Sequence, residues 1–167
     1  EDIVEVNFGN QTVLAVPYDM PVSGCKTSNI GTLRLWQSEA VTEFDFDLFN
    51  SQNYLEASKE KIYAEDISRV LYPNDDTNEG KKLRLKQQYF FCCASLTDIL
   101  KKHKEKHGTL ENLDEFVTIQ LNDTHPVISI PELIRQLMDI EGFDYKKAFN
   151  ITSKVFNYTN HTIMQEA

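Results

Sequence analysis

Two polar clusters in the last third of the chain contain residue types that could bind a ligand. Residues 120–126 read Gln-Leu-Asn-Asp-Thr-His-Pro and end the apolar run 116–121, and residues 158–162 read Tyr-Thr-Asn-His-Thr. In an open α/β sheet, ligands bind outside the carboxyl ends of the strands. Asparagine, aspartate, threonine and histidine at two such ends favour hydrogen bonding to a hydroxyl-rich ligand.

The histidines of these clusters, His125 and His161, are the leading candidates for a binding site, because each lies near an asparagine. A histidine at the end of a strand or helix is often a packed or capping residue, and that interpretation stays open. Asp123 could orient His125 or accept a ligand hydroxyl, or it could start the loop through an Asx turn. A metal site formed by Asp123, His125 and His161 is a further alternative.

A second group of candidates surrounds an acidic turn in the middle of the chain. Asp75 and Asp76 lie in the turn 74–80, and Arg84 follows in the first turns of a long predicted helix. Arg84 could contact a ligand or form a structural ion pair. The turn resembles a calcium loop only superficially, since the bidentate glutamate is missing. The sequence also lacks glycine-rich nucleotide loops, a nucleophile elbow and zinc-ligand spacing.

The composition excludes several classes of protein. The chain has 167 residues, 41% of them hydrophobic, which is enough for one domain with a core. Its net charge of -9 argues against nucleic-acid binding. No apolar run is long enough to cross a membrane, and no signal peptide is recognisable. Adjacent Cys92 and Cys93 in an apolar segment predict reduced core thiols, so we expect a cytoplasmic protein.

Hydrophobic patterns and turn residues predict the elements of the first part of the chain. Residues 5–16 predict short strands around a Gly-Asn turn, and residues 32–36 predict another strand. Between them, Pro17, Pro21 and Gly24 predict a loop.

The next segment mixes short patterns. Residues 44–49 alternate phenylalanine and aspartate, which predicts a half-buried strand or a tight turn. The segment from Tyr54 to Tyr63 has a thin apolar stripe, so we expect a helix that projects from the body of the protein. Residues 64–71 predict a short helix that ends before the acidic turn.

The longest helix is predicted for residues 81–107. Its middle, residues 89–94, is apolar on all sides and should be deeply buried, and Gly108 fits its C-terminal cap. Residues 116–121 then predict a strand.

Two more helices are predicted after that strand. Ser129 and Glu132 have the spacing of a capping box and predict the start of the first, which Gly142 should end. Asp144 should cap the second. The apolar stripe of the first helix is Ile130, Leu133, Ile134, Leu137 and Met138. The inward-facing residues of the second are Ala148, Phe149, Val155 and Phe156. Strand, helix, helix and polar turn indicate α/β organisation.

Longer motifs carry a family resemblance over almost the whole chain. Residues 15–22 read Ala-Val-Pro-Tyr-Asp-Met-Pro-Val and precede Thr-Leu-Arg-Leu-Trp at 32–36. Residues 67–75 read Ile-Ser-Arg-Val-Leu-Tyr-Pro-Asn-Asp, and 79–90 continue the match. With the two polar clusters, these motifs resemble the amino-terminal half of an α-glucan phosphorylase, the family of glycogen, starch and maltodextrin phosphorylases.

The resemblance implies a partial Rossmann-like N-terminal domain of a GT-B glycosyltransferase, a fold in which the active site lies between two such domains. Residues 1–167 would be an internal fragment of the first domain, with the C-terminal pyridoxal phosphate domain absent. The sequence starts without methionine and stops without a tail, which we also interpret as a fragment.

The family reaction is phosphorolysis of an α-1,4-glucan or maltooligosaccharide by inorganic phosphate, which gives α-glucose-1-phosphate. Pyridoxal phosphate is held by a lysine of the second domain. The resemblance therefore implies a fragment that is inactive alone and has neither catalytic nor cofactor-binding residues. The alternative is a non-catalytic carbohydrate-binding or regulatory relative.

The resemblance assigns substrate-binding roles to individual residues. His161 matches the histidine that binds the hydroxymethyl end of the sugar, and Asp123 and His125 match residues that line the pocket beside the anomeric face. The mobile loop that gates the cleft, and the arginine behind it, are matched by Asn74, Asp75, Asp76 and Arg84. The segment from Tyr54 to Tyr63 matches the tower helix that contacts the partner subunit of a homodimer.

Some positions depart from the family pattern. Asp76 replaces the usual asparagine that touches the sugar, and Thr77 replaces a common aromatic residue. Lys101 and Lys102 replace an arginine pair that binds the phosphate of AMP in animal enzymes. Lysine lacks the bidentate fork of arginine, so activation by AMP is not expected.

Overall fold

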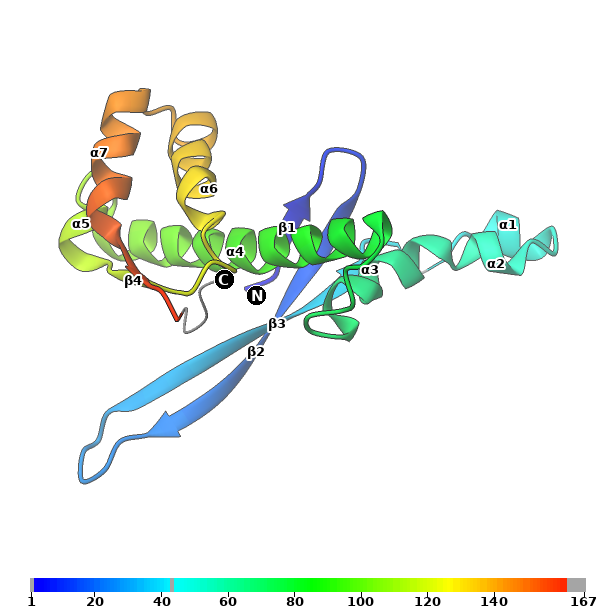
Figure 1. The fold of residues 1–167 in the computed structure, drawn as a ribbon, viewed down its shortest axis with the longest axis horizontal. Helices are drawn as coiled ribbons and strands as arrows, with labels where there is room; N and C mark the ends of the chain where they lie inside the picture. Colours follow the sequence, from blue (N-terminus) through cyan, green and yellow to red (C-terminus); the bar gives the residue numbers. More distant parts are fainter. Residues whose placement is uncertain (1, 43, 162–167) are drawn as a thin grey trace. The chain divides into compact units, whose positions relative to one another are not determined.

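The computed structural model describes residues 2–42 and 44–161 (Figure 1). The chain divides into two compact units, Glu1–Phe90 and Phe91–Ala167, and each is described by itself. Thr162, the last residue of the second polar cluster, lies outside the described residues. Within the described part of the chain, no helix combines the length and hydropathy needed to span a membrane.

The first unit contains a three-stranded antiparallel sheet in the order β1 (Val4–Asn7), β2 (Thr12–Ser23), β3 (Ile30–Ala40). Burial in β1 alternates, as expected for a strand with one covered face. Val4 pairs with Ala15 and Val6 pairs with Val13, and all four side chains are buried. The predicted strands are therefore confirmed, and β3 extends well beyond residues 32–36.

The loop predicted at Pro17 and Pro21 is wrong, because both prolines lie inside β2. β2 has a neighbour on both sides only at residues 13–15, and from residue 16 onward it pairs with β3 alone. A proline has no N–H for a ladder, so it is tolerated where one side of a strand is open.

Three short helices follow: α1 (Phe46–Asn50), α2 (Tyr54–Ala57) and α3 (Lys59–Arg69). The strand or turn predicted at residues 44–49 is wrong. Asp45 Oδ1 instead accepts a hydrogen bond from the Leu48 N–H at 3.0 Å and caps α1. Ala64 and Ile67 of α3 are buried, and α3 packs against β3.

The helix predicted from Tyr54 to Tyr63 is interrupted at Ser58. Its second part continues without a break through the helix predicted at 64–71, so both form α3. Figure 1 shows α1 and α2 beyond the end of α3 that lies away from the sheet.

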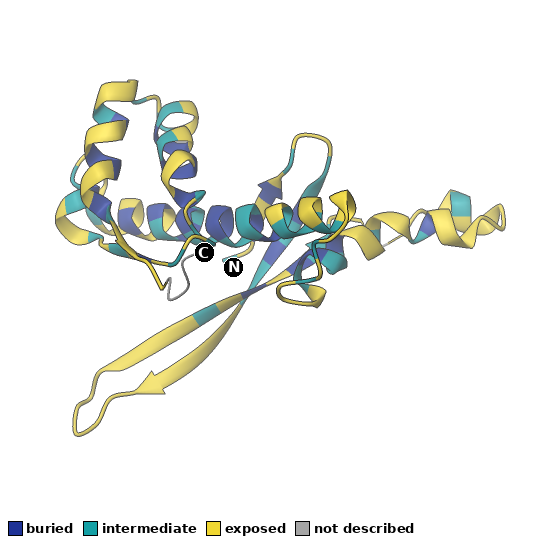
Figure 2. Ribbon diagram, in the orientation of Figure 1, coloured by how far each residue is buried: buried dark blue, intermediate teal, exposed yellow. Residues whose placement is uncertain are grey.

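Helix α4 (Asn78–His107) confirms the longest predicted helix and begins slightly earlier. The predicted burial of its middle is confirmed, since Phe90, Cys92, Cys93 and Ala94 are buried. Figure 2 shows dark, buried bands along the middle of α4. Gly108 has φ +73° and donates its N–H to the Lys104 carbonyl, as predicted for the C-terminal cap.

The second unit continues with α5 (Leu113–Phe116), β4 (Ile119–Asn122), α6 (Ser129–Arg135), the π-helical turn η1 (Gln136–Ile140), α7 (Tyr145–Val155) and β5 (Phe156–Thr159). β4 and β5 are parallel and are joined by the helical crossover α6–η1–α7. This is a β-α-β arrangement and confirms α/β organisation. The buried core of the unit is Leu96, Leu100, Leu110, Leu113, Leu133, Leu137, Ala148, Ile151 and Val155.

Local signals predicted parts of this unit. Asp144 accepts a hydrogen bond from the Lys147 N–H at 2.9 Å, so the predicted cap of α7 is confirmed. Gly142 has φ +75° and follows the end of η1, also as predicted. Phe149, predicted to face inward, is 52% exposed, whereas Thr152 is buried.

Two other predictions in this unit are wrong. The strand predicted from residue 116 starts only at Ile119, because Phe116 ends α5. The capping box does not form: the N-cap of α6 is Ile128, and Glu132 bonds to Arg135 within the helix. Glu132 is nearly fully buried, so its carboxylate needs a partner within the protein. The Arg135 guanidinium is that partner, and the Glu132 side chain therefore does not bond the backbone at the start of the helix.

Candidate functional site

The loop after β4 turns sharply at Asp123, which has φ +70°, a left-handed conformation that aspartate tolerates better than most residues. Its N–H donates to the Thr159 carbonyl at 2.8 Å, and its Oδ1 accepts from the Thr124 N–H at 2.7 Å. Asp123 therefore starts the loop, but its side chain bonds the N–H of the next residue and not the one two residues on, as the predicted Asx turn would require. One carboxylate oxygen is used for this turn.

The other carboxylate oxygen, Oδ2, lies 3.8 Å from His125 Nε2. Both side chains are partly exposed, so they can meet a ligand from solvent. The Cys92 thiol of α4 lies 3.7 Å from the Pro126 carbonyl oxygen and holds the backbone directly after His125. Asp123 and His125 thus belong to one anchored loop with a shared polar face.

His161 is brought to this loop by the pairing of β4 with β5. The register places Asn122 opposite Thr159, and the Gln120 amide donates to Thr159 Oγ1 at 2.7 Å. Past the end of β5, His161 Nε2 hydrogen-bonds Asn122 Oδ1. The polar clusters, separate in sequence, therefore meet where His161 contacts Asn122, and Asp123 and His125 follow Asn122 in the same loop.

Asn122 is the residue that the sequence interpretation missed as a member of the site. It lies in the middle of the first polar cluster, but its partner comes from a segment 39 residues later. A prediction of parallel pairing between residues 119–122 and 156–159 would have indicated it. Residues 156–159 were not predicted as a strand, so that signal was not available.

The candidates of the first unit form a separate group in the turn between α3 and α4. Arg84 Nη1 lies 3.0 Å from Asp75 Oδ2, and its guanidinium lies 5.6 Å from the Tyr72 ring centroid. The Asp76 N–H donates to Asn74 Oδ1 at 3.0 Å, and the Asn74 amide donates to Asp76 Oδ2 at 2.9 Å. The structural ion pair proposed for Arg84 is therefore present.

The structure also shows what Asp76 and Thr77, the two residues of this turn that depart from the family pattern, contact. The Asn74 amide partly offsets the extra charge of Asp76, because an amide N–H donates well to a carboxylate. Thr77 Oγ1 accepts from the Gly80 N–H at 3.1 Å, which is the bond of a helix-capping residue. Both substitutions thus have a local structural use.

The metal alternative would require several ligating side chains close together. Among residues 2–42 and 44–161, no group of three or more histidine, cysteine, aspartate or glutamate side chains is placed to hold a metal ion. Asp123, His125 and His161 are arranged around an amide and a backbone turn, which suits hydrogen bonding to neutral hydroxyls.

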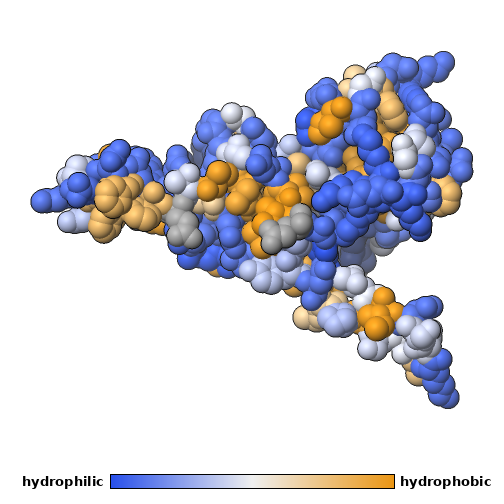
Figure 3. Space-filling model, turned by 180° about the vertical axis from the view of Figure 1, so that it is seen from behind, coloured by the Kyte–Doolittle hydropathy of each residue, from blue (hydrophilic) through white to orange (hydrophobic). Residues whose placement is uncertain are grey.

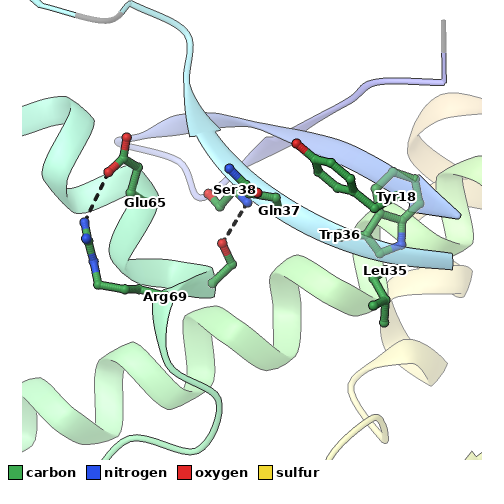
Figure 4. A pocket seen from close by; sticks show the side chains of 8 residues that line it. Tyr18, Leu35, Trp36, Gln37, Ser38, Glu65 and Arg69 are labelled. Atoms are coloured by element: carbon green, nitrogen blue, oxygen red, sulfur yellow. Dashed lines mark hydrogen bonds and ion pairs between the residues drawn. The ribbon is translucent and has the colours of Figure 1, made fainter. Parts of the chain in front are cut away.

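A pocket of about 470 Å³ opens between β3 and α3 and contains none of the predicted site residues (Figure 4). Trp36 and Tyr18 form its aromatic wall, and Arg69 and Glu65 lie at the other side. Arg69 bonds Asp66 at 2.7 Å and Glu65 at 3.2 Å, so its charge is matched by the protein itself. We therefore place the candidate site at the polar loops and not here.

The helix after the first polar cluster holds a buried charge. Glu132 accepts hydrogen bonds from Arg135 and from the Gln136 amide, each at 2.8 Å. Burial alone would raise the pKa of this carboxyl, but the bonds from Arg135 and Gln136 outweigh it and lower the pKa below its usual range. The group is a charged anchor within α6 at neutral pH.

Comparison with known proteins gives a consistent result. A family model described as carbohydrate phosphorylase matches residues 2–167. Glycogen phosphorylase of Saccharomyces cerevisiae is 53% identical over 96% of this chain and 18% of its own length. Glycogen phosphorylase of Chlamydia trachomatis is 46% identical over 99% of this chain, and the brain form of Homo sapiens is 50% identical over 94%. The chain spans about a fifth of the length of these relatives.

Proposed function

Because this chain belongs to the carbohydrate phosphorylase family, we propose that the protein of which it forms part is an α-1,4-glucan phosphorylase. That protein would cleave the non-reducing end of an α-1,4-glucan or maltooligosaccharide with inorganic phosphate and release α-glucose-1-phosphate. The main structural support is the contact between His161 and Asn122, which joins the two polar clusters at one strand end.

Within this proposal, the second unit binds the sugar. His161 contacts the hydroxymethyl group, while Asp123 and His125 line the pocket beside the anomeric face. Asp123 is suited to this role because the backbone turn holds one carboxylate oxygen and leaves the other directed toward His125. Fixed acceptors of this kind hold sugar hydroxyls without reorganisation during binding.

The turn of the first unit forms the gate of the cleft. Asn74 and Asp76 are held together by their own hydrogen bonds, and Arg84 ties Asp75 of the same turn to α4. A closed gate excludes water, which favours attack by phosphate over hydrolysis. A gate needs an anchor at its base, and the pair of Arg84 with Asp75 supplies one.

We also propose the architecture of the whole protein. The parallel pair β4–β5 with its helical crossover is the repeating unit of Rossmann-like folds, which supports a GT-B domain of which residues 1–167 form an internal part. Cys92 and Cys93 are buried thiols and not disulfides, which suits a reducing compartment, so we infer a cytoplasmic location.

Pyridoxal phosphate would be bound by the C-terminal domain and would supply acid–base chemistry there. A Schiff base requires a lysine amine, and the site residues of this chain are histidine, aspartate, asparagine and arginine. The cofactor therefore does not fit the site described here, and we expect the chain alone to be inactive. Borohydride reduction of the chain with pyridoxal phosphate should give no stoichiometric label at one lysine.

A homodimer is proposed through the segment from Tyr54 to Tyr63. Exposed aromatic rings gather around α1 and α2: Phe49 lies 4.9 Å from Tyr54 and 5.7 Å from Phe44, centroid to centroid. Figure 3 shows hydrophobic residues at this end of the first unit, at the left of the view. Aromatic clusters of this kind are typical of interfaces.

The test is release of glucose-1-phosphate from maltoheptaose and phosphate by the full-length protein, with and without pyridoxal phosphate. We expect release that depends on the cofactor, and His161→Ala should lower kcat/KM by roughly 10-fold or more. The matched control is His107→Ala, which removes a histidine that stacks on Phe116 outside the site. No release from folded, cofactor-loaded protein would contradict the proposal.

The second candidate is a non-catalytic carbohydrate-binding or regulatory relative. Asp76 favours this candidate, because its negative charge would repel phosphate in a cleft that binds phosphate. Calorimetry with maltoheptaose separates the two. Sugar binding without phosphorolysis, lost in His161→Ala, would select this candidate.

A further inference from the structure

We propose that Asn122 fixes the tautomer of His161 and thereby makes this histidine a hydrogen-bond acceptor for the sugar. The part about the tautomer concerns this chain alone, and the part about the sugar rests on the proposed function. Asn122 would act through His161, so it is a positioning residue.

The contact itself decides where the imidazole proton lies. Asn122 Oδ1 is an amide oxygen, which only accepts, and it faces His161 Nε2. A neutral imidazole carries one proton, so this contact requires the proton on Nε2. Nδ1 then keeps its lone pair and can accept a hydrogen bond.

The backbone at Asn122 is held by contacts between both strands. Asn122 ends β4 opposite Thr159, and the N–H of the next residue, Asp123, donates to the Thr159 carbonyl at 2.8 Å. The Gln120 amide donates to Thr159 Oγ1 at 2.7 Å from the same side of β4. The backbone that carries Asn122 is therefore fixed relative to the backbone that leads to His161.

An accepting nitrogen selects the group that it binds. A sugar hydroxyl can donate to Nδ1, whereas a fluorine in its place cannot donate, and an anionic substituent meets a lone pair instead of a proton. The tautomer thus favours an unmodified hydroxymethyl group over a substituted one. A site built to bond a hydroxyl rejects an analogue that lacks the proton.

The first experiment reads the tautomer without any activity. The 167-residue chain is labelled with ¹⁵N-histidine, and long-range ¹H–¹⁵N spectra assign the protonated nitrogen of His161 at a pH where the ring is neutral. We expect the proton on Nε2 in the native chain and in Asn122→Asp, which retains an acceptor. Asn122→Ala should give a mixture of both tautomers.

Asn157→Ala is the matched control, since Asn157 is an exposed asparagine of the neighbouring strand β5. It should leave the tautomer unchanged. A native chain with the proton on Nδ1, or an Nε2 proton that survives in Asn122→Ala, would overturn the proposal. Because Asn122 is exposed and polar, its substitution should not unfold the chain, and the spectra of the variants should be those of folded protein.

The second experiment uses the full-length protein in the direction of glucan synthesis. Glucose-1-phosphate is compared with its 6-deoxy-6-fluoro analogue in the native protein, Asn122→Ala and Asn122→Asp. Asn122→Ala should lower kcat/KM for glucose-1-phosphate by about 3- to 10-fold and lower it less for the analogue. The ratio of kcat/KM for glucose-1-phosphate to kcat/KM for the analogue should therefore decrease in Asn122→Ala and return towards the native value in Asn122→Asp.

The outcomes of the two experiments distinguish a wrong function from a wrong positioning role. If the full-length protein shows no phosphorolysis but the tautomer shifts in Asn122→Ala, the proposed function is wrong and the positioning role stands. If the protein is active but discrimination is the same in Asn122→Ala, the positioning role is wrong and the function stands.

Discussion

The backbone carbonyl oxygen of Asn74 lies where a side chain at residue 80 would begin, since a Cβ built on Gly80 would be 2.3 Å from it. The Gly80 N–H also donates to Thr77 Oγ1 at 3.1 Å, in the first turn of α4. The proposed gate is therefore folded directly against the start of the long helix, and only glycine permits this approach.

Gly80→Ala should push the Asn74 backbone away and lower the free energy of unfolding by about 1–3 kcal/mol, the usual cost of overpacking. Urea unfolding of the chain measures it. Gly31→Ala is the control, because its Cβ would meet its nearest neighbour at an ordinary 3.8 Å. Equal stability of the two variants would show that the turn can shift without strain.

Arg84→Gln should loosen the gate while changing global stability little. The ion pair with Asp75 is partly exposed, so its loss should cost less than about 1 kcal/mol. Amide hydrogen exchange should nevertheless become faster at residues 74–77. Arg69→Gln, which breaks a comparable exposed pair with Asp66, is the control and should leave those amides unchanged. Unaltered exchange in Arg84→Gln would mean that the turn is held without this pair.

The parts of the fold that could be predicted depend on neighbours in sequence. The apolar middle of α4, the Gly108 cap and the Asp144 cap all rest on residues within a few positions, and all are confirmed. Asp45 is a similar local signal and lies within the Phe-Asp alternation of residues 44–49. A single side-chain bond to the Leu48 N–H outweighed a strand pattern with no partner strand.

The candidate site shows the opposite limit. Its residue types could be chosen from the sequence, but their arrangement comes from the β4–β5 pairing, which joins residues 37 positions apart. Pro17 and Pro21 illustrate the same point, because their place in β2 depends on an open strand edge that only the assembled sheet defines. Pairing between segments that are distant in sequence has no short local pattern from which it could be predicted.

The cysteines should differ in reactivity. Cys25 is exposed, whereas Cys92 and Cys93 are buried, and burial raises the pKa of the Cys92 thiol. A thiol reagent such as dithionitrobenzoate should modify Cys25 rapidly in the folded chain and the other two only after unfolding in guanidinium. The variant Cys25→Ser should therefore show almost no fast reaction. Fast modification of more than one thiol in the native chain would contradict the burial of Cys92 and Cys93.

Glu132 links the stability of the second unit to pH. Its pKa is lowered in the folded chain, where Arg135 and Gln136 donate to the carboxylate despite its burial, while in the unfolded chain it returns to the ordinary value of 4.5. Above that value both states are ionised, and the stabilisation is complete. As pH falls below it, the unfolded chain takes up the proton first, so the stabilisation is lost as pH approaches the folded pKa.

Glu132→Gln should therefore lower the free energy of unfolding at pH 7 by about 1–3 kcal/mol, less than for a fully buried pair because Arg135 is 43% exposed. The difference from the native chain should shrink as pH falls below 4.5, since the native carboxylate then becomes neutral as well. Urea unfolding at several pH values measures both effects. Glu141→Gln is the matched control, because Glu141 pairs with Lys104 at the surface and its loss should cost less than about 1 kcal/mol. A difference for Glu132→Gln that stays constant down to the folded pKa would show that the variant acts through packing and not through charge.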